Sequence, residues 1–218
     1  MSGEYIPAVD IDSPPPGETL NETGEVVTPR QAAGVILLRG GADALEILLV
    51  KRTPKARFMG GVWVFPGGAV DATEAENDAP HRVAAVRELR EEAGIAVEDP
   101  AALALFSRWI TPEEVSIRFD TRFFLAPAPP GQDPAIDGDE VVDHGWFSPQ
   151  AALDAHQREE ILLVFPTIKD LEKMTPHASA DALLEATRSG VVAPTLPKVI
   201  TGDGRARVVL PGEPGYDD

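Results

Sequence analysis

Two runs of apolar residues predict a β-hairpin. Residues 32–38 read AAGVILL and residues 45–50 read LEILLV, with Gly40 and Gly41 between them. Short continuous apolar runs on either side of a glycine-containing break are typical of buried strands joined by a turn. We therefore expect a mostly buried sheet to begin at Ala32.

A further short strand is predicted at residues 62–65, which read VWVF. Pro66, Gly67 and Gly68 stop this run, because proline cannot donate to a β-ladder and glycine favours turns. We expect the turn to lead through a loop into a helix.

That helix is predicted to end at Gly94, since glycine commonly follows the last residue of a helix. Its apolar stripe consists of Val86, Leu89 and Ala93. At the other end, Pro80 suits the first turn, and Asn77 or Asp78 can cap the N-terminus.

The remaining pattern alternates between strands and helices, which is typical of the α/β class. Strands are expected at residues 116–125 and 141–147, helices from Ser148-Pro149 and at 168–174 and 180–189, and a β-turn at 202–204 in the tail.

The same pattern divides the chain into three parts. Residues 1–28 are rich in Pro, Asp, Glu, Ser and Thr and lack periodic apolar positions, so we expect a flexible acidic arm. Residues 29–190 are expected to form one catalytic domain, because 218 residues suffice for one sizeable core. Residues 191–218 are expected to be an extension that packs on the domain or on a partner.

Charge and composition narrow the classes of partner. The net charge of −17 repels nucleic acid and anionic membranes, so neither is expected as a partner. An anionic ligand would need a local device such as bound cations or a basic cluster. The absence of cysteine excludes thiolate chemistry. The first residues resemble no signal peptide, and a cytoplasmic location is expected.

Three glutamates carry the candidate chemistry. Glu88, Glu91 and Glu92 lie at i, i+3 and i+4, which brings their carboxylates onto one helical face. On spacing alone a solvated acidic face is the commoner explanation. The glycine turn before the helix shifts the balance, because glycine backbone can closely approach a metal or a phosphate, and hard cations such as Mg²⁺ or Mn²⁺ prefer clustered oxygen ligands.

The segment that contains these residues resembles the Nudix box. It runs from Gly67-Gly68 through five residues to Glu74, and then to Arg87-Glu88-Leu89-Arg90-Glu91-Glu92-Ala93-Gly94-Ile95. The resemblance implies an α/β/α sandwich around a mixed sheet. It also implies a metal-dependent hydrolase in which helix glutamates bind the metals that activate water against a diphosphate.

Roles carried over by position follow from that resemblance. Glu88 and Glu92 correspond to principal metal ligands, Glu91 to a further ligand or the base, and Arg87 to the residue that orients a glutamate. Gly67 would offer its carbonyl oxygen to a metal.

The match has one departure, because twelve residues separate Glu74 from Arg87 where the family pattern has seven. Asp71 and Glu76 are therefore alternatives to Glu74. Such an interrupted box, with the segments around residues 58–68, 109–112 and 119–125, resembles the coenzyme A diphosphatase branch of the family.

Two further groups are candidates. Arg52, Lys55 and Arg57 form a basic cluster that could bind a phosphate together with Gly68, although a solvated hairpin end is an equal explanation. Glu140 resembles a position where some Nudix enzymes place an extra acid.

The predicted function is hydrolysis of a nucleoside diphosphate linked to another moiety, with coenzyme A derivatives, ADP-ribose and dinucleotides all admissible. The alternative is an inactive nucleotide-binding or regulatory module on the same fold. The expected partner is a small diphosphate, and by analogy with such enzymes a homodimer is also admissible.

Overall fold

The computed structural model describes residues 9–10, 18–42, 44–77, 79–202 and 205–217. Most of the expected N-terminal arm, Asp78 as a helix cap and two residues of the expected 202–204 turn lie outside these ranges. No helix in the described part of the chain combines the length and the apolar composition that crossing a bilayer requires.

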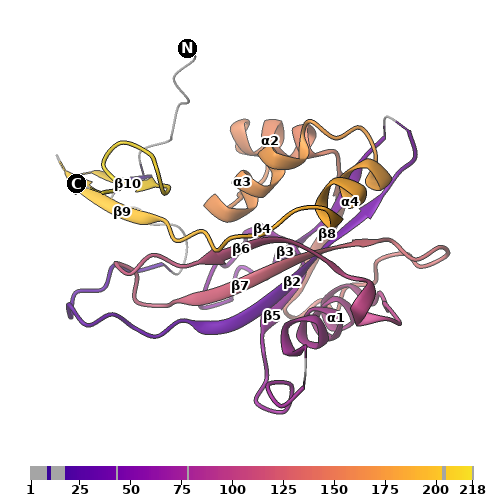
Figure 1. Cartoon of the computed structure of the whole chain (residues 1–218), viewed down its shortest axis with the longest axis horizontal. Helices are drawn as coiled ribbons and strands as arrows, with labels where there is room; N and C mark the ends of the chain where they lie inside the picture. Colours follow the sequence, from indigo (N-terminus) through magenta and orange to yellow (C-terminus); the bar gives the residue numbers. More distant parts are fainter. Residues whose placement is uncertain (1–8, 11–17, 43, 78, 203–204, 218) are drawn as a thin grey trace.

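A mixed sheet of seven strands forms the centre of the molecule, and it confirms the expected mixed-sheet class (Figure 1). The order is β4-β3-β2-β7-β6, while β5 pairs with β2 and β8 pairs with β3. Only the β2–β7 pairing is parallel among these strands. The bounds are β2 Arg30–Arg39, β3 Glu46–Arg52, β4 Trp63–Val64, β5 Gly67–Ala69, β6 Ala104–Ile110, β7 Phe119–Pro127 and β8 Val141–Phe147.

Alternation along β2 and β3 gives this sheet two apolar faces, because successive side chains of a strand point to opposite sides. Ile36 and Leu38 belong to one buried cluster, whereas Val35 and Leu37 belong to the other. Both faces must therefore be covered.

Helices cover the two faces and complete the expected α/β/α sandwich. Helix α1 (Pro80–Ala93) packs on the face that carries Val35, through small residues and Leu89. Helices α2 (Pro149–Gln157), α3 (Phe165–Met174) and α4 (Ala180–Arg188) lie on the opposite face (Figure 1).

The ends of α1 agree only in part with the sequence prediction. Pro80 occupies the first turn, and Gly94 ends the helix in the left-handed conformation with φ of 67°. Asn77 does not cap the helix, because Ala79 is the N-cap residue and no side chain caps it. The Asn77 amide instead donates to the Glu74 carbonyl, at 3.1 Å, and stabilises the preceding loop.

The strand predicted at residues 116–125 begins later, at Phe119. The backbone of Ser116 donates to the carbonyl of Thr19, and Leu20 forms an antiparallel bridge with Val115. Residues 115–116 therefore pair with the N-terminal segment instead of extending β7. Strands β5 and β6 and the 3-10 turn η1 (Pro100–Ala102) were not predicted, and α3 begins three residues before the predicted position.

The C-terminal extension forms a hairpin of β9 (Lys198–Gly202) and β10 (Arg205–Val209), and β1 (Val9–Asp10) pairs with β10. Before the hairpin, Thr195 bridges Trp109 of β6. Both terminal segments are thus hydrogen bonded to the described domain.

Candidate active site

The glycine strand β5 separates two features of the molecule. Gly67 and Gly68 pair with β2 and line a cavity on one side. On the other side they meet helix α1: the Gly67 N–H donates to Glu92, and a Cβ atom at Gly68 would collide with the Glu88 carboxylate. Glycine is required at Gly67 as well, where a Cβ would lie 2.6 Å from the Cα of Gly34.

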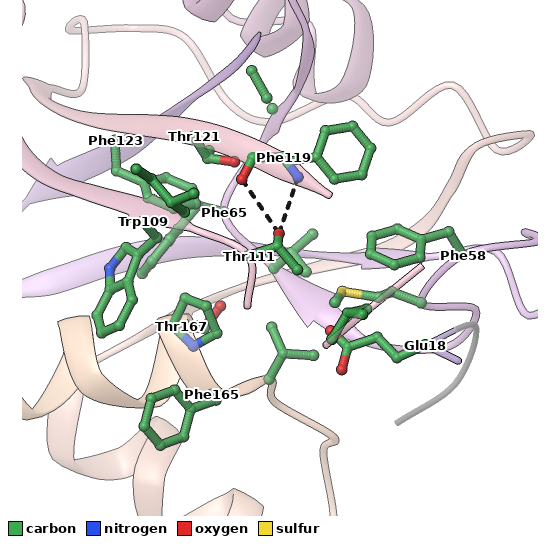
Figure 2. Close-up of a pocket in the computed structure, with 18 of the residues that line it drawn as sticks. Glu18, Phe58, Phe65, Trp109, Thr111, Phe119, Thr121, Phe123, Phe165 and Thr167 are labelled. Carbon is green, nitrogen blue, oxygen red and sulfur yellow. Dashed lines mark hydrogen bonds between the residues drawn. The ribbon is translucent and has the colours of Figure 1, made fainter. Parts of the chain in front are cut away.

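The cavity measures about 400 Å³ and is lined mainly by aromatic and aliphatic side chains (Figure 2). Phe119, Thr121 and Phe123 reach it from alternate positions of β7. Trp109 of β6 and Phe165 at the start of α3 contribute a further wall, with their rings 6.0 Å apart in an edge-to-face arrangement.

The three helix glutamates, equivalent by spacing, differ in burial. The exposed fraction of the side chain is 13% for Glu88, 58% for Glu91 and 4% for Glu92. The structure therefore brings Glu88 and Glu92 to the glycine strand and leaves Glu91 at the edge.

Glu92 lies in the most constrained position of the three. Its Oε2 accepts the Gly67 N–H at 2.9 Å, and its Oε1 lies 3.8 Å from Nη1 of Arg52. Burial, and to a lesser extent the charge of Glu88, raises the pKa of Glu92 to about 7, although the Gly67 N–H and Arg52 act in the opposite direction. The surroundings of this carboxylate hold too little positive charge to offset its desolvation.

Glu88 and Glu140 contribute negative charge to the surroundings of Glu92. Burial raises the pKa of Glu88 above its ordinary value, the hydrogen bond and the charge of Arg87 act in the opposite direction, and the charges of Glu91 and Glu140 add smaller increases. Glu140 is exposed just before β8, and its charge also contributes to the raised pKa of Glu92.

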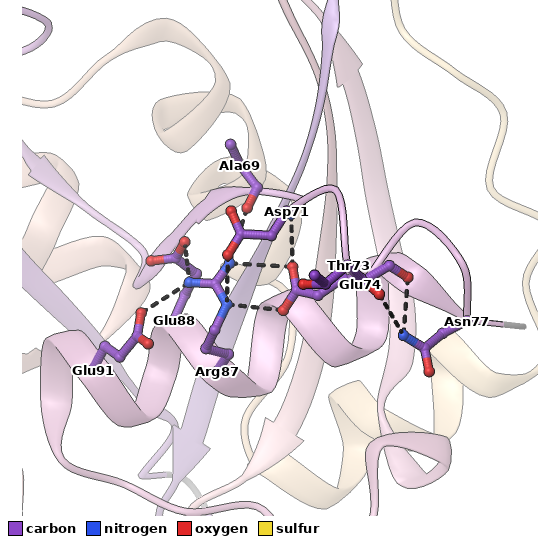
Figure 3. A network of polar contacts seen from close by, with 8 residues as sticks. All are labelled: Ala69, Asp71, Thr73, Glu74, Asn77, Arg87, Glu88 and Glu91. Atoms are coloured by element: carbon purple, nitrogen blue, oxygen red, sulfur yellow. Dashed lines mark hydrogen bonds and ion pairs between the residues drawn. The ribbon is translucent and has the colours of Figure 1, made fainter.

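Arg87 holds the loop and the helix together (Figure 3). Its Nε and Nη2 donate to the two carboxylate oxygens of Glu74, at 2.8 and 3.2 Å. Its Nη1 donates to Glu88 and Glu91, both at 2.8 Å, and Nη2 also donates to the Ala69 carbonyl. The hydrogen bond from Arg87 to Glu74 is the largest cause of the raised pKa of Arg87.

Among the three acids that were candidates in the lengthened loop, Glu74 makes the closest pair with Arg87. Glu74 is buried and also accepts the Asp71 N–H at 2.8 Å. The Asp71 carboxylate lies 3.8 Å from Arg87, and Glu76 is exposed. The longer loop therefore folds so that Glu74 reaches Arg87.

The residues present fit a hard divalent cation. Glu88 and Glu92 supply carboxylate oxygens in a partly buried place with excess negative charge, and backbone without a Cβ lies beside them at Gly67 and Gly68. Within the described ranges no three acidic or histidine side chains converge as a ligand cluster. The fit therefore depends on two glutamates with a backbone oxygen, and Arg87 is hydrogen bonded to one of these two, Glu88, as well as to Glu91.

The basic cluster predicted from the sequence is divided by the fold. Arg52 lines the cavity beside the glycine strand. Its Nε is buried and has no hydrogen-bond partner among the described residues. Lys55 and Arg57 are exposed and do not line the cavity.

Most cavity residues were not identified from the sequence. The alternation of Phe119, Thr121 and Phe123 was a usable signal, because it places them on one face of a strand. Trp109 and Phe123 line the cavity, whereas Trp63 and Phe124 are buried in the core. No local signal indicated that the C-terminal hairpin would contribute.

Comparison with known proteins identifies the family to which the domain is similar. The family model described as "NUDIX domain" matches residues 28–165. The chain is 27% identical to the Caenorhabditis elegans protein named "Putative nudix hydrolase 7", over 87% of this chain and 75% of that protein. It is 25% identical to the human acyl-coenzyme A diphosphatase NUDT19, over 86% of this chain and 80% of that protein.

Solved structures agree with this result. A NUDIX hydrolase from Alicyclobacillus acidocaldarius superposes with a TM-score of 0.67 at 25% identity, covering 77% of this chain and all of that one. A MutT NUDIX hydrolase from Burkholderia pseudomallei superposes with a TM-score of 0.52 at 28% identity, covering 67% of this chain and 98% of that one.

Proposed function

The chain belongs to the Nudix hydrolase family, and on that premise we propose that it hydrolyses the diphosphate bond of a nucleoside diphosphate linked to another moiety. The proposed site is the junction of helix α1, the glycine strand β5 and the cavity. A small molecule that extends from the carboxylates into the cavity would cross this junction.

Arg52 is the observation that carries the proposal. Its guanidinium lies between Glu92 and the cavity, and its buried Nε lacks a protein partner in the described part of the chain. A buried donor without a partner costs about 1–3 kcal/mol, so such a donor at a functional site is commonly satisfied by a ligand. A phosphate oxygen is a suitable acceptor, because arginine binds phosphate through charge-assisted hydrogen bonds.

The positions of the three helix glutamates support different roles in metal binding and proton transfer. Glu88, Glu92 and the Gly67 carbonyl would hold Mg²⁺ or Mn²⁺, which when bound supplies positive charge that polarises the phosphoryl group. Glu91 is the least buried of the three and is free of the glycine strand, so we assign it the acceptance of a proton from water, with Glu92 as the alternative base. Arg87 orients Glu88 and Glu91.

The cavity and the relatives support the proposed substrate class. Coenzyme A derivatives, ADP-ribose and dinucleotides all contain the required diphosphate. The name of the human relative supports the first of these. The homodimer and the cytoplasmic location expected from the sequence stay predictions.

A substrate panel tests this function. The purified chain is incubated with Mg²⁺ or Mn²⁺ and with coenzyme A, acyl-coenzyme A, ADP-ribose and diadenosine substrates, and products are detected by mass. We expect cleavage of the diphosphate in at least one of them and loss of turnover when the metal is chelated. Tight binding of substrates without product from any of them would instead favour the nucleotide-binding module.

A matched pair of variants tests the site. Glu92→Gln keeps the shape of the side chain and removes its charge, so turnover should fall by about 10²-fold or more while the fold is retained. Glu76→Gln makes the same change at an exposed position of the preceding loop and should keep wild-type turnover. Full activity of Glu92→Gln would contradict the assignment.

A further inference from the structure

The cavity beside the glycine strand is built from parts of the chain that are distant in sequence. Strands β2, β6 and β7 form one wall and the start of α3 forms another. Further parts of the wall come from Phe58 and Met59 before β4, from the C-terminal hairpin through Val199 and Val208, and from Glu18 of the N-terminal segment. The family match ends at residue 165, so the hairpin lies outside it.

The chemistry of the lining favours an apolar occupant. Most of the lining side chains are aromatic or aliphatic, and the polar ones are Glu18, Arg30, Arg52, Trp109 and the threonines Thr111, Thr121 and Thr167. The Thr111 hydroxyl is already used, because it bonds to the N–H and the carbonyl of Phe119, at 3.0 and 3.3 Å (Figure 2). The Trp109 N–H is likewise used, since it donates to the buried Asp170 at 3.1 Å. The Thr121 and Thr167 hydroxyls and the Glu18 carboxylate are thus the few polar groups at the wall besides the two arginines, and a mainly apolar lining favours an apolar ligand group over a nucleobase or a sugar.

Two of the three charged lining residues are basic, and the third is Glu18. Arg52 joins the cavity to Glu92, and Arg30 is an exposed lining residue whose guanidinium lies over the Phe119 ring, 5.9 Å from its centroid. The cavity therefore combines a basic group beside the glycine strand with an apolar interior.

The hairpin is held in place against the domain. Val199 and Val208 are direct cross-strand partners, so both side chains point to the same face of the hairpin. The Val199 N–H donates to the Glu114 carboxylate at 3.2 Å, and the Ile110 N–H donates to the Thr195 carbonyl at 2.8 Å. These bonds fix the valine pair at the cavity wall.

We propose that this cavity binds an apolar group that the substrate carries beyond its diphosphate, and that Val199 and Val208 limit the size of that group. The proposal rests on the proposed diphosphate hydrolysis, which it deepens by assigning the substrate class and two specificity residues. A compact aliphatic chain attached to the diphosphate fits the lining.

Alkyl esters of ADP provide the probe. The methyl, hexyl and dodecyl esters share the nucleoside and the diphosphate and differ only in apolar length. Each methylene that leaves water for an apolar site changes binding by about fourfold. We expect kcat/KM of the full chain to rise by about tenfold or more from the methyl to the hexyl ester, and calorimetric affinity to rise in parallel.

Substitutions in the hairpin test the two valines. Val199→Asp places a charge at the wall and should lower the hexyl-to-methyl ratio of kcat/KM by about tenfold. Val199→Phe stays apolar and favours a strand, but it reduces the space, so the ratio of dodecyl to hexyl should fall. Val191→Asp makes the matched change at a residue that is 99% exposed and should keep the wild-type ratios.

The results of these experiments distinguish the apolar site from the diphosphate hydrolysis on which its proposal rests. Cleavage of all three esters with equal kcat/KM and equal affinity would overturn the apolar site and leave the hydrolase intact. If no ester is cleaved, tighter calorimetric binding of the hexyl ester that Val199→Asp abolishes still supports the apolar site, and the substrate panel decides the hydrolase proposal separately. Unchanged ratios of kcat/KM in both Val199 variants would show that the hairpin does not determine which esters are preferred.

Discussion

At the scale of single residues, burial distinguishes side chains that helical spacing makes equivalent. Glu92 is nearly inaccessible and accepts a backbone N–H from the glycine strand, whereas Glu91 is more than half exposed and bonds only to Arg87 among the described residues. The difference arises because Glu92 faces the Gly67 backbone and Glu91 lies farther round the helix. Position in the helix therefore does not by itself define a role at this site.

Arg87 is the residue whose geometry cannot be reproduced by another cation. Its guanidinium donates to Glu74 through two nitrogens and to Glu88, Glu91 and the Ala69 carbonyl through the remaining donors. Lysine offers a single charged nitrogen and cannot satisfy acceptors in these separate directions.

Arg87→Lys should therefore lower the free energy of unfolding by about 1–3 kcal/mol and reduce turnover, because the glutamates lose their orientation. Denaturant unfolding and steady-state kinetics measure the two effects. Arg90→Lys on the exposed side of the same helix is the control and should change neither. A wild-type unfolding free energy in Arg87→Lys would show that the network contributes no stability.

At the scale of elements, helix α1 and the loop before it act as one unit. The loop is five residues longer than the family pattern, yet Glu74 still pairs with Arg87, and the Asp71 N–H and the Asn77 amide stabilise its turn. The insertion is accommodated between Glu74 and the helix, and the helix keeps its register against the glycine strand.

The C-terminal end of α1 depends on glycine. Gly94 has a φ of 67°, and a Cβ there would lie 2.9 Å from the Ala135 carbonyl oxygen. Gly94→Ala should thus destabilise the protein by about 1–2 kcal/mol, as measured by denaturant unfolding. Gly41→Ala is the comparison, since nothing lies within 4 Å of a Cβ at Gly41, and it should be neutral or slightly stabilising. Equal stability of the two variants would contradict a requirement for glycine at the helix end.

At the scale of the whole molecule, the two terminal segments meet on one loop. The segment 19–21 pairs with residues 114–116, and the hairpin bonds to the Glu114 side chain. These parts are distant in sequence, and Val115 of the loop where they meet lines the cavity. The terminal segments therefore contribute to the site as well as to the surface.

Glu114 is the residue through which this junction can be tested. Glu114→Ala removes the acceptor of the Val199 N–H, a bond worth about 0.5–1.5 kcal/mol, so the Val199 amide should exchange with deuterium several-fold faster. Glu113, the exposed neighbour of Glu114, provides the control. Glu113→Ala should leave the exchange rate of the Val199 amide unchanged. Unaltered exchange in Glu114→Ala would show that the hairpin is held by other contacts.

The sequence by itself determined the elements whose periodicity is strong and local. The continuous apolar runs of β2 and β3, the strand β8 and the ends of α1 at Pro80 and Gly94 follow from local pattern. Apolar runs and the conformational preferences of proline and glycine act over a few residues. The acidic cassette on α1 was recognisable for the same reason.

Only the tertiary structure decided which of these residues meet. It paired Glu74 with Arg87 across a lengthened loop, buried Glu92 against Gly67, kept Arg52 at the cavity while leaving Lys55 exposed, and brought Val199 to the cavity wall. These contacts join parts of the chain that are distant in sequence, and their free energy depends on the packing of the sheet and both helical layers, so no local pattern encodes them.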